Sequence, residues 1–226
     1  MSERSPVAAS VVLGVAVGAF GMSFGVLCAT AGLSTAKACA LSLLVFTGAS
    51  QFTAVTVLKS GGSPAAALGS ALLLAARNGA YGLAVSPFIR GSRVKRLASA
   101  QLVIDESTAM ATAQGSDAMK EHGFYAAGLA VFVFWNLGTL IGALGGQRIG
   151  RPESLGLDAA FPAGFLALLV PHVRTVSGRR AAVGGALIAL ALVPVAPAGV
   201  PILAAGLAAL VGLRSHRPER VGEDAA

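Results

Sequence analysis

A single arginine, Arg77, lies near the centre of the apolar run Ser63–Ile89, with Asn78 beside it and Tyr81 one helical turn later. An arginine at the centre of a membrane helix costs roughly 2.5–3.5 kcal/mol on insertion scales, so it usually faces a bundle interior or an aqueous cavity. We therefore expect Arg77 to mark a substrate pathway. The alternative is a structural ion pair with a neighbouring helix.

Two acidic residues, Asp105 and Glu106, are candidate partners for Arg77 or candidate proton carriers. Buried carboxylates shift towards neutrality and can cycle between two protonation states. Both lie in Leu97–Gln114, which is too polar for a simple lipid-facing span. We expect this segment to form an amphipathic or re-entrant helix packed against the bundle. A surface helix with both carboxylates in solvent is the alternative.

A polar face is expected within the apolar segment Leu41–Val55. Helical spacing places Thr47, Ser50 and Gln51 on this face, with Gly48 beside them. A buried glutamine has donors and acceptors that must be satisfied, so the face should meet another helix or a substrate. We expect a substrate-lining role, and hydrogen bonding between helices is the alternative.

A second polar ridge lies in the apolar segment Phe132–Gly146 and consists of Trp135, Asn136 and Thr139. Glycines recur beside it at the spacing that lets two helix backbones approach closely. The ridge is a second candidate substrate surface. Trp135 alternatively anchors its helix at the membrane interface.

These polar side chains are informative because the rest of the chain is apolar. Its 226 residues are 55% hydrophobic and 12% charged, whereas about 25% of the residues in soluble domains are charged. The mean hydropathy is +0.75. Several apolar runs approach or exceed the roughly 20 residues that cross a bilayer as a helix. They are Val7–Ala31, Ala38–Leu58, Pro64–Phe88, Phe124–Gly145, Ala159–Val173, Ala181–Val195 and Ala198–Leu213.

This pattern predicts an all-α, polytopic membrane helix bundle of six to seven spans with one re-entrant or amphipathic helix. A single integral-membrane domain is expected over residues 1–213, followed by a short disordered cytoplasmic tail over residues 214–226. The first run is longer than the core of a signal peptide, so we interpret it as part of the bundle.

The net charge of +7 comes from basic residues in short connectors, which indicates membrane topology and not nucleic-acid binding. Three clusters are expected on the cytoplasmic side of the cytoplasmic (inner) membrane, which also makes the C-terminus cytoplasmic. They are Arg90, Arg93, Lys95 and Arg96; Arg174, Arg179 and Arg180; and Arg214, Arg217 and Arg220. The position of the N-terminus, and whether the first run crosses or re-enters, stay open.

The sequence offers no set of residues for catalysis. It contains no HExxH, GxSxG or Walker motif, and its three histidines are scattered. We expect a protein that is not an enzyme and that uses no metal or cofactor.

Six strings, in order along most of the chain, together resemble the AzlC family, the large subunit of branched-chain amino acid exporters. They are FGVLCATAGLS from Phe24, LSLLVFTGASQFTAV from Leu41, RNGAYGLAVSPFIRG from Arg77, IDESTA from Ile104, FWNLGTLIGALGG from Phe134 and LDAAFPAGFLALLVP from Leu157. The resemblance implies a secondary transporter that exports leucine, isoleucine, valine or an analogue with a small AzlD-like membrane subunit.

For such a substrate, we expect Arg77 to bind the carboxylate. The ammonium group would meet Thr47, Ser50 and Gln51 together with a carboxylate, and the aliphatic side chain would meet Phe46, Phe52 and Tyr81. Secondary transporters commonly build such sites near the bilayer midplane. Proton coupling through Asp105 or Glu106 is a further hypothesis.

Three positions depart from the usual pattern of the family. The chain has Ala75 where the family usually has asparagine, Asn78 where it has histidine, and Ile104 where it has threonine. The substrate is therefore open: the alternatives are a transporter of another small solute, or a membrane scaffold or channel-like subunit without a transport cycle. Asn78 is included among the candidate substrate-binding residues.

Overall fold

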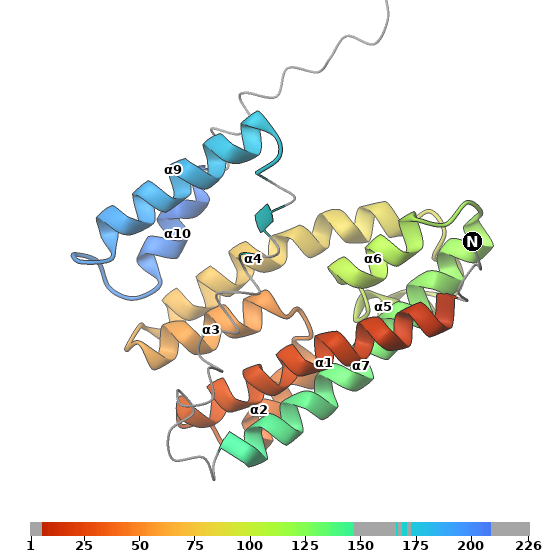
Figure 1. The fold of residues 1–226 in the computed structure, drawn as a ribbon, viewed down its shortest axis with the longest axis horizontal. Helices are drawn as coiled ribbons and strands as arrows, with labels where there is room; N and C mark the ends of the chain where they lie inside the picture. The colour runs from red at the N-terminus through yellow and green to blue at the C-terminus, as the bar shows by residue number, and fades with distance from the viewer. Residues whose placement is uncertain (1–5, 147–165, 167–168, 171–172, 209–226) are drawn as a thin grey trace, which may run out of the picture.

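The computed structural model describes residues 6–146, 166, 169–170 and 173–208. Within these ranges, regular structure is helical throughout, which confirms the all-α prediction (Figure 1). The helices are α1 (Pro6–Thr30), α2 (Thr35–Leu44), α3 (Ala49–Lys59), α4 (Pro64–Val85), α5 (Arg93–Ala100), α6 (Asp105–Thr112), α7 (Asp117–Gly146), α9 (Val176–Leu192) and α10 (Val200–Gly206). Most of the predicted span Ala159–Val173 and the whole predicted tail, residues 214–226, lie outside the described residues.

Two helices, α1 and α7, have the length and apolar composition needed to cross a membrane, among the residues that the structure describes. The predicted six to seven spans are therefore not confirmed by the described residues. The 22 residues of α4 would extend about 33 Å at about 1.5 Å per residue. Arg77 and Asn78 lower its hydropathy, because arginine and asparagine are costly to place in hydrocarbon.

The core of the bundle is the pair α1 and α7, which pack closely through glycines. Gly18 lies against Gly138, and Gly25 and Met22 lie against Gly142. Because residue numbers rise together along the two helices, α1 and α7 are parallel (Figure 1). The start of α1 therefore lies at the same end of the bundle as the start of α7.

Replacing Gly142 with alanine should loosen this contact. A Cβ atom at Gly142 would overlap the main-chain oxygen of Met22, and overpacking of this kind costs typically about 1–3 kcal/mol. We expect a lower midpoint of thermal unfolding in detergent for Gly142→Ala. Gly145→Ala is the matched control, since a Cβ there meets nothing within 4 Å. Equal midpoints for the two variants would contradict this packing.

The predicted second span, Ala38–Leu58, is not one helix, and that part of the prediction is wrong. It forms a hairpin of α2 and α3 with a tip at residues 45–48, where Gly48 has a φ of +59° that favours glycine. The Lys59 Nζ donates a hydrogen bond of 3.0 Å to the Thr30 Oγ1. The hairpin therefore enters the bundle where α1 ends and returns to that same end.

A second hairpin, formed by α5 and α6, enters from the opposite end. Lys95 at its entrance pairs with Glu121 near the start of α7. At its tip, Leu102 packs against Gly128, further along α7. Its second limb returns towards the start of α7, where Met110 packs against Gly123. Both hairpins thus turn back inside the bundle.

The two tips meet each other in the middle of the molecule. The Gln101 side-chain amide donates a hydrogen bond of 2.8 Å to the Leu43 carbonyl, and Ile104 shares a buried cluster with Phe46. The segment Leu97–Gln114, predicted as one helix, is therefore split between two short helices with a tip at residues 101–104. Both short helices pack against the bundle, as predicted.

The last helices pack on the outer side of α4 through α10. The Ser70 hydroxyl donates to the Gly199 carbonyl at 3.3 Å, and Gly206 packs against Leu73. Since α9 runs antiparallel to α10, its first turn lies towards the end of α4 (Figure 1).

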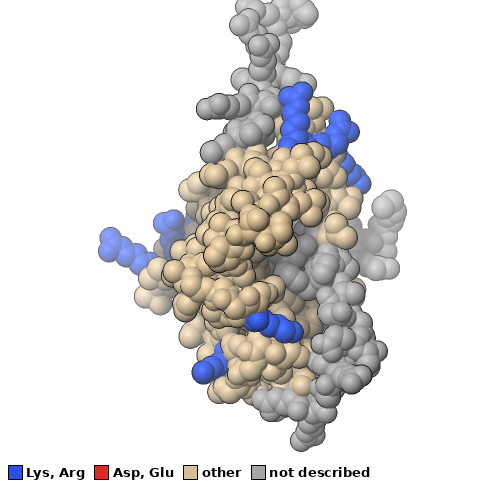
Figure 2. Space-filling view, turned by 90° about the vertical axis from the view of Figure 1, so that its left-hand side faces the viewer, with Lys and Arg blue, Asp and Glu red and all other residues tan. Residues whose placement is uncertain are grey.

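Basic residues are therefore distributed unequally between the two ends of the bundle. The start of α9, with Arg179 and Arg180, lies at the same end as α5. Figure 2, which shows the left-hand side of Figure 1, has a mostly uncharged surface on which basic side chains gather near the top and are scattered elsewhere; no acidic side chain of the described residues is visible on it.

Candidate functional site

A cavity of about 410 Å³ opens where the two hairpin tips meet α4. Pockets that hold small molecules are commonly about 300–1,000 Å³. The first hairpin contributes Leu44, Val45, Phe46 and Thr47; α4 contributes Asn78 and Gly82; and the second hairpin contributes Ala100, Gln101 and Val103. The lining is mostly apolar, and three separate chain segments build it.

Two polar atoms in this lining have no hydrogen-bond partner among the residues that the structure describes. They are the hydroxyl oxygen of Thr47 and the side-chain carbonyl oxygen of Asn78, and both are buried. Buried polar atoms are nearly always hydrogen-bonded in proteins, so such exceptions often mark a binding site. Because Asn78 Oδ1 is an acceptor and the Thr47 hydroxyl can accept, the cavity is suited to a ligand that donates hydrogen bonds.

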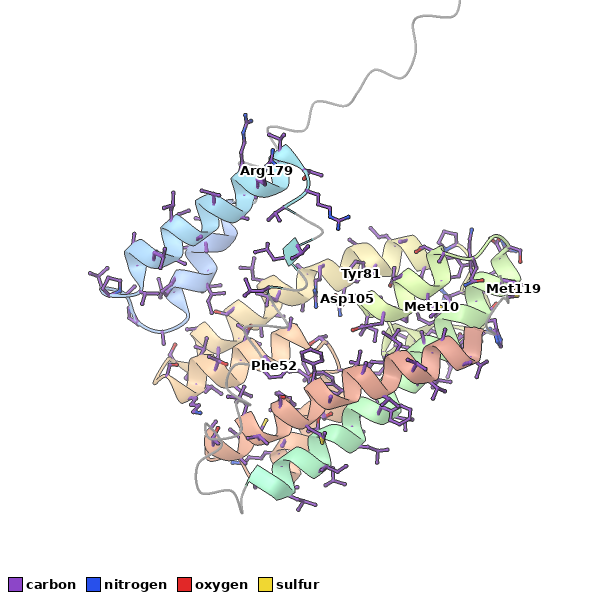
Figure 3. The ribbon with its side chains drawn as sticks, in the orientation of Figure 1. Phe52, Tyr81, Asp105, Met110, Met119 and Arg179 are labelled. Atoms are coloured by element: carbon purple, nitrogen blue, oxygen red, sulfur yellow. The ribbon has the colours of Figure 1, made fainter. Side chains whose placement is uncertain are left out.

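An ion pair is formed by two residues that adjoin the cavity in sequence, although neither Arg77 nor Asp105 is one of its lining residues. The Arg77 guanidinium lies 2.9 Å from the Asp105 carboxylate, and these side chains are 31% and 28% exposed. Tyr81 of α4 lies next to Asp105 of α6 (Figure 3). Glu106 follows Asp105 in the first turn of α6 and makes no ion pair within the described part of the chain. The structure therefore brings together one paired and one unpaired carboxylate beside the only charged residue of α4.

The side-chain amide of Gln51 forms hydrogen bonds within the first hairpin through both its oxygen and its nitrogen. Its Oε1 accepts from the Gly48 N–H at 3.1 Å, and its Nε2 donates to the Leu41 carbonyl at 2.9 Å. Its side chain is buried. These bonds join the two limbs across the tip, and Thr47 lies outside either helix. The predicted single face of Thr47, Ser50 and Gln51 therefore does not exist, and Ser50 is buried in the first turn of α3.

Replacing Gln51 with leucine should destabilise this hairpin. The substitution leaves the Gly48 N–H without a partner and removes one of the two hydrogen bonds that the Leu41 carbonyl accepts, the other coming from the Val45 N–H. An unsatisfied buried group costs roughly 1–3 kcal/mol. We expect a clear drop in the thermal unfolding midpoint. Gln114→Leu is the control, because the Gln114 amide bonds only to the carbonyl of Met110, one turn earlier. Equal stability of both variants would show that Gln51 does not hold the tip.

The predicted aromatic residues divide between the cavity and the core. Phe46 lines the cavity and contacts Phe132 with ring centroids 5.0 Å apart. Phe52 instead packs edge-on against Phe24 and Trp135, at 5.4 and 6.1 Å (Figure 3). Trp135 is buried in the core with its indole N–H unpartnered, so its position is not that of an interface anchor.

The other two residues of the predicted ridge on α7 form hydrogen bonds with protein groups. Thr139 is fully buried and accepts a hydrogen bond of 3.1 Å from the Ser42 hydroxyl. The Asn136 amide donates to the Phe132 carbonyl at 2.7 Å, and its own carbonyl oxygen is buried without a partner. Thr139 therefore links α7 to α2, and neither residue lines the cavity.

Sequence reasoning missed the second tip as a part of the site. Ala100, Gln101 and Val103 line the cavity, yet the pattern around them signalled only a polar segment. Gly82 was also missed; a Cβ atom there would meet nothing within 4 Å, so the space beside it is open. Among the described residues, no group of three histidine, cysteine, aspartate or glutamate side chains is placed to hold a metal ion.

Comparison with known proteins gives the same family that the sequence strings suggested. The sequence model of the family described as AzlC protein matches residues 12–149. An uncharacterized membrane protein of Archaeoglobus fulgidus is 32% identical over 190 residues, covering 82% of each chain. One from Helicobacter pylori is 25% identical over 190 residues, covering 83% of this chain and 82% of the relative. No solved structure is significantly similar.

Proposed function

Because this chain belongs to the AzlC family of membrane proteins, we propose that it is the transporter subunit of an exporter of branched-chain amino acids. The observation that carries the proposal is the cavity between the two hairpin tips, with unpartnered Thr47 and Asn78 in its wall and Arg77 beside it. Substrate sites in secondary transporters commonly lie near the midplane at broken helices.

The chemistry of the lining fits an aliphatic amino acid. Its ammonium group donates hydrogen bonds, which the Asn78 carbonyl oxygen and the Thr47 hydroxyl are free to accept. Its side chain is apolar, as are Val45, Phe46 and Val103 in the same wall. Burying that side chain contributes about 25 cal/mol per Å² of apolar surface.

The carboxylate of the substrate would bind Arg77. The guanidinium is paired with Asp105, so the substrate must compete with Asp105 for the same positive charge. Arginine suits this exchange, because it keeps its charge and offers several donors in a planar fork. Binding would thereby release the link between α4 and the second hairpin, which couples occupation of the cavity to movement of a tip.

The proposal also includes the orientation of the chain in the membrane and its association with a second subunit. The basic residues of α5 and of the start of α9 lie at one end of the bundle, and basic loops favour the cytoplasmic side. We propose that the start of α1 is cytoplasmic as well, since α1 is parallel to α7. We further propose that the chain lies in the cytoplasmic membrane and works with a small AzlD-like subunit.

Export of valine, leucine and isoleucine from preloaded cells tests the proposal. Cells would express the chain with and without the small subunit, as the native sequence, as Asn78→Leu, and as Leu83→Ala. Leu83 is a matched control on α4, since it is strongly exposed and does not line the cavity. Losing a hydrogen bond to a charged group costs about 1.5–3 kcal/mol, so we expect Asn78→Leu to slow efflux about 10- to 100-fold.

The control and the substrate panel decide between the alternatives. Leu83→Ala should export at the native rate. If the native pair moves none of the three amino acids but a broader panel reveals another solute whose export Asn78→Leu slows, the cavity is the site and the substrate is different. No Asn78-dependent transport of any solute would indicate a scaffold or channel-like subunit.

A further inference from the structure

A second cavity, of about 440 Å³, lies between the end of α4 and α5, at the end of the bundle that carries the basic residues. Its inner wall is apolar: Val85, Ile89 and Phe124 are all buried there. Arg93 and Arg96, one turn apart on α5, line the same cavity from the exposed side. A hydrophobic recess thus opens beneath two guanidinium groups.

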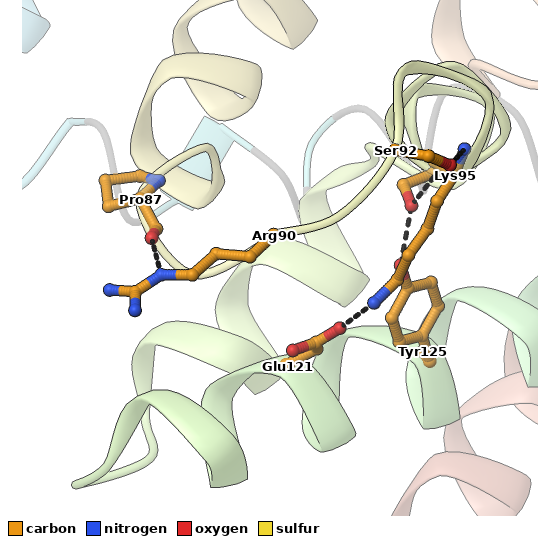
Figure 4. Close-up of polar contacts among 7 residues, drawn as sticks. Pro87, Arg90, Ser92, Lys95, Glu121 and Tyr125 are labelled. Atoms are coloured by element: carbon orange, nitrogen blue, oxygen red, sulfur yellow. Dashed lines mark hydrogen bonds and ion pairs between the residues drawn. The ribbon is translucent and has the colours of Figure 1, made fainter.

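The four basic residues of this region divide into two pairs by their contacts. Lys95 lies 2.5 Å from Glu121 of α7 (Figure 4). Arg90 lies 3.4 Å from Asp117, which also pairs with Lys120 at 3.6 Å. Arg93 and Arg96 make no ion pair within the described part of the chain. The two cations that line the cavity are therefore the two of these four that form no ion pair with a described residue.

The outer surface of α5 is apolar beside these charges. Val94 and Leu97 are 77% and 75% exposed on a helix of eight residues. A helix with exposed apolar side chains next to basic ones is typical of the boundary between lipid headgroups and acyl chains. The tip of the same hairpin is buried in the bundle, so α5 is fixed at this level.

We propose that this cavity binds one anionic phospholipid, with its phosphate group at Arg93 and Arg96 and an acyl chain along Val85 and Ile89. Charge complementarity identifies the headgroup, because two unpaired guanidinium groups favour a phosphate and can hold it through paired hydrogen bonds. The apolar wall selects a lipid over a free phosphate ion. Basic pockets between membrane helices on the cytoplasmic side bind anionic headgroups in this manner.

Lipid binding to the purified full-length chain tests the proposal. The chain would be titrated in neutral detergent with phosphatidylglycerol or phosphatidylcholine, and bound lipid would be counted by native mass spectrometry. Three forms are compared: native, Arg93→Gln with Arg96→Gln, and Arg90→Gln with Lys95→Gln. The two double variants lose the same charge. Both sites are on exposed side chains, so folding should be preserved, and the thermal midpoint of each form is recorded.

The expected result is a preference for phosphatidylglycerol in the native chain that falls at least tenfold in the Arg93 and Arg96 double variant. The Arg90 and Lys95 double variant should keep its preference within twofold. Equal losses in both double variants would overturn the proposal, since they would indicate attraction to net charge alone. It is also overturned if the native chain shows no preference, or if inorganic phosphate displaces the lipid at equal concentration, which would indicate an ion site.

Discussion

Arg77→Ala is expected to reduce export about 10- to 100-fold, because a charge-assisted hydrogen bond contributes about 1.5–3 kcal/mol. In the proposed cycle Arg77 has two partners in turn, Asp105 in the empty site and the substrate carboxylate in the loaded one. Alanine removes both interactions. Measurement of initial efflux rates from loaded cells, normalised to the amount of protein in the membrane, checks the prediction.

The variant Arg77→Lys distinguishes a role of Arg77 in substrate recognition from a role in the stability of the protein. Lysine keeps the charge that faces Asp105 but lacks the planar fork that binds a carboxylate at two points. We expect Arg77→Lys to keep the native thermal midpoint within a few degrees while the substrate concentration for half-maximal export rises. If Arg77→Lys exports with native affinity and Arg77→Ala fails only because it unfolds, Arg77 is a structural residue.

Hydropathy predicted that the chain is helical but not the path of the chain through its helices. The run Ala38–Leu58 is as apolar as a crossing helix, because a hairpin that turns back inside the bundle is surrounded by the same apolar side chains. The path of the chain is determined instead by individual contacts, such as the hydrogen bond between Lys59 and Thr30. Gly48 is the one local signal of the turn, and a lone glycine inside an apolar run also occurs in continuous helices.

The candidate site was predicted only in part, because hydropathy does not give the path of the chain. Phe46, Thr47 and Asn78 were named from the sequence and line one cavity. Gln51 was also named, but helical periodicity could not show that a non-helical tip would leave backbone groups that its amide satisfies. The second tip was missed because its contribution depends on contacts between segments that are far apart in sequence.

Glu106→Gln is expected to remove the dependence of export on a pH gradient. Asp105 is held by Arg77, whereas Glu106, beside it in the first turn of α6, has no ion-pair partner among the described residues. A carboxyl group without a fixed counter-charge is the one that can gain and lose a proton as its surroundings change. We therefore propose Glu106 as the proton carrier and Asp105 as the residue that holds Arg77 between transport events.

The size of the expected substrate gradient follows from the free energy of the pH gradient. One pH unit corresponds to 1.36 kcal/mol per proton, so a gradient of two units supports about a 100-fold substrate gradient in one-proton exchange. Native protein in proteoliposomes with its partner subunit should approach that ratio, and Glu106→Gln should bring the ratio to one while still exchanging labelled for unlabelled substrate. Asp105→Asn should keep the response to the pH gradient but transport more slowly, because Arg77 loses its partner. Full pH-driven accumulation by both variants would exclude these carboxylates from coupling, since neither amide can carry the proton.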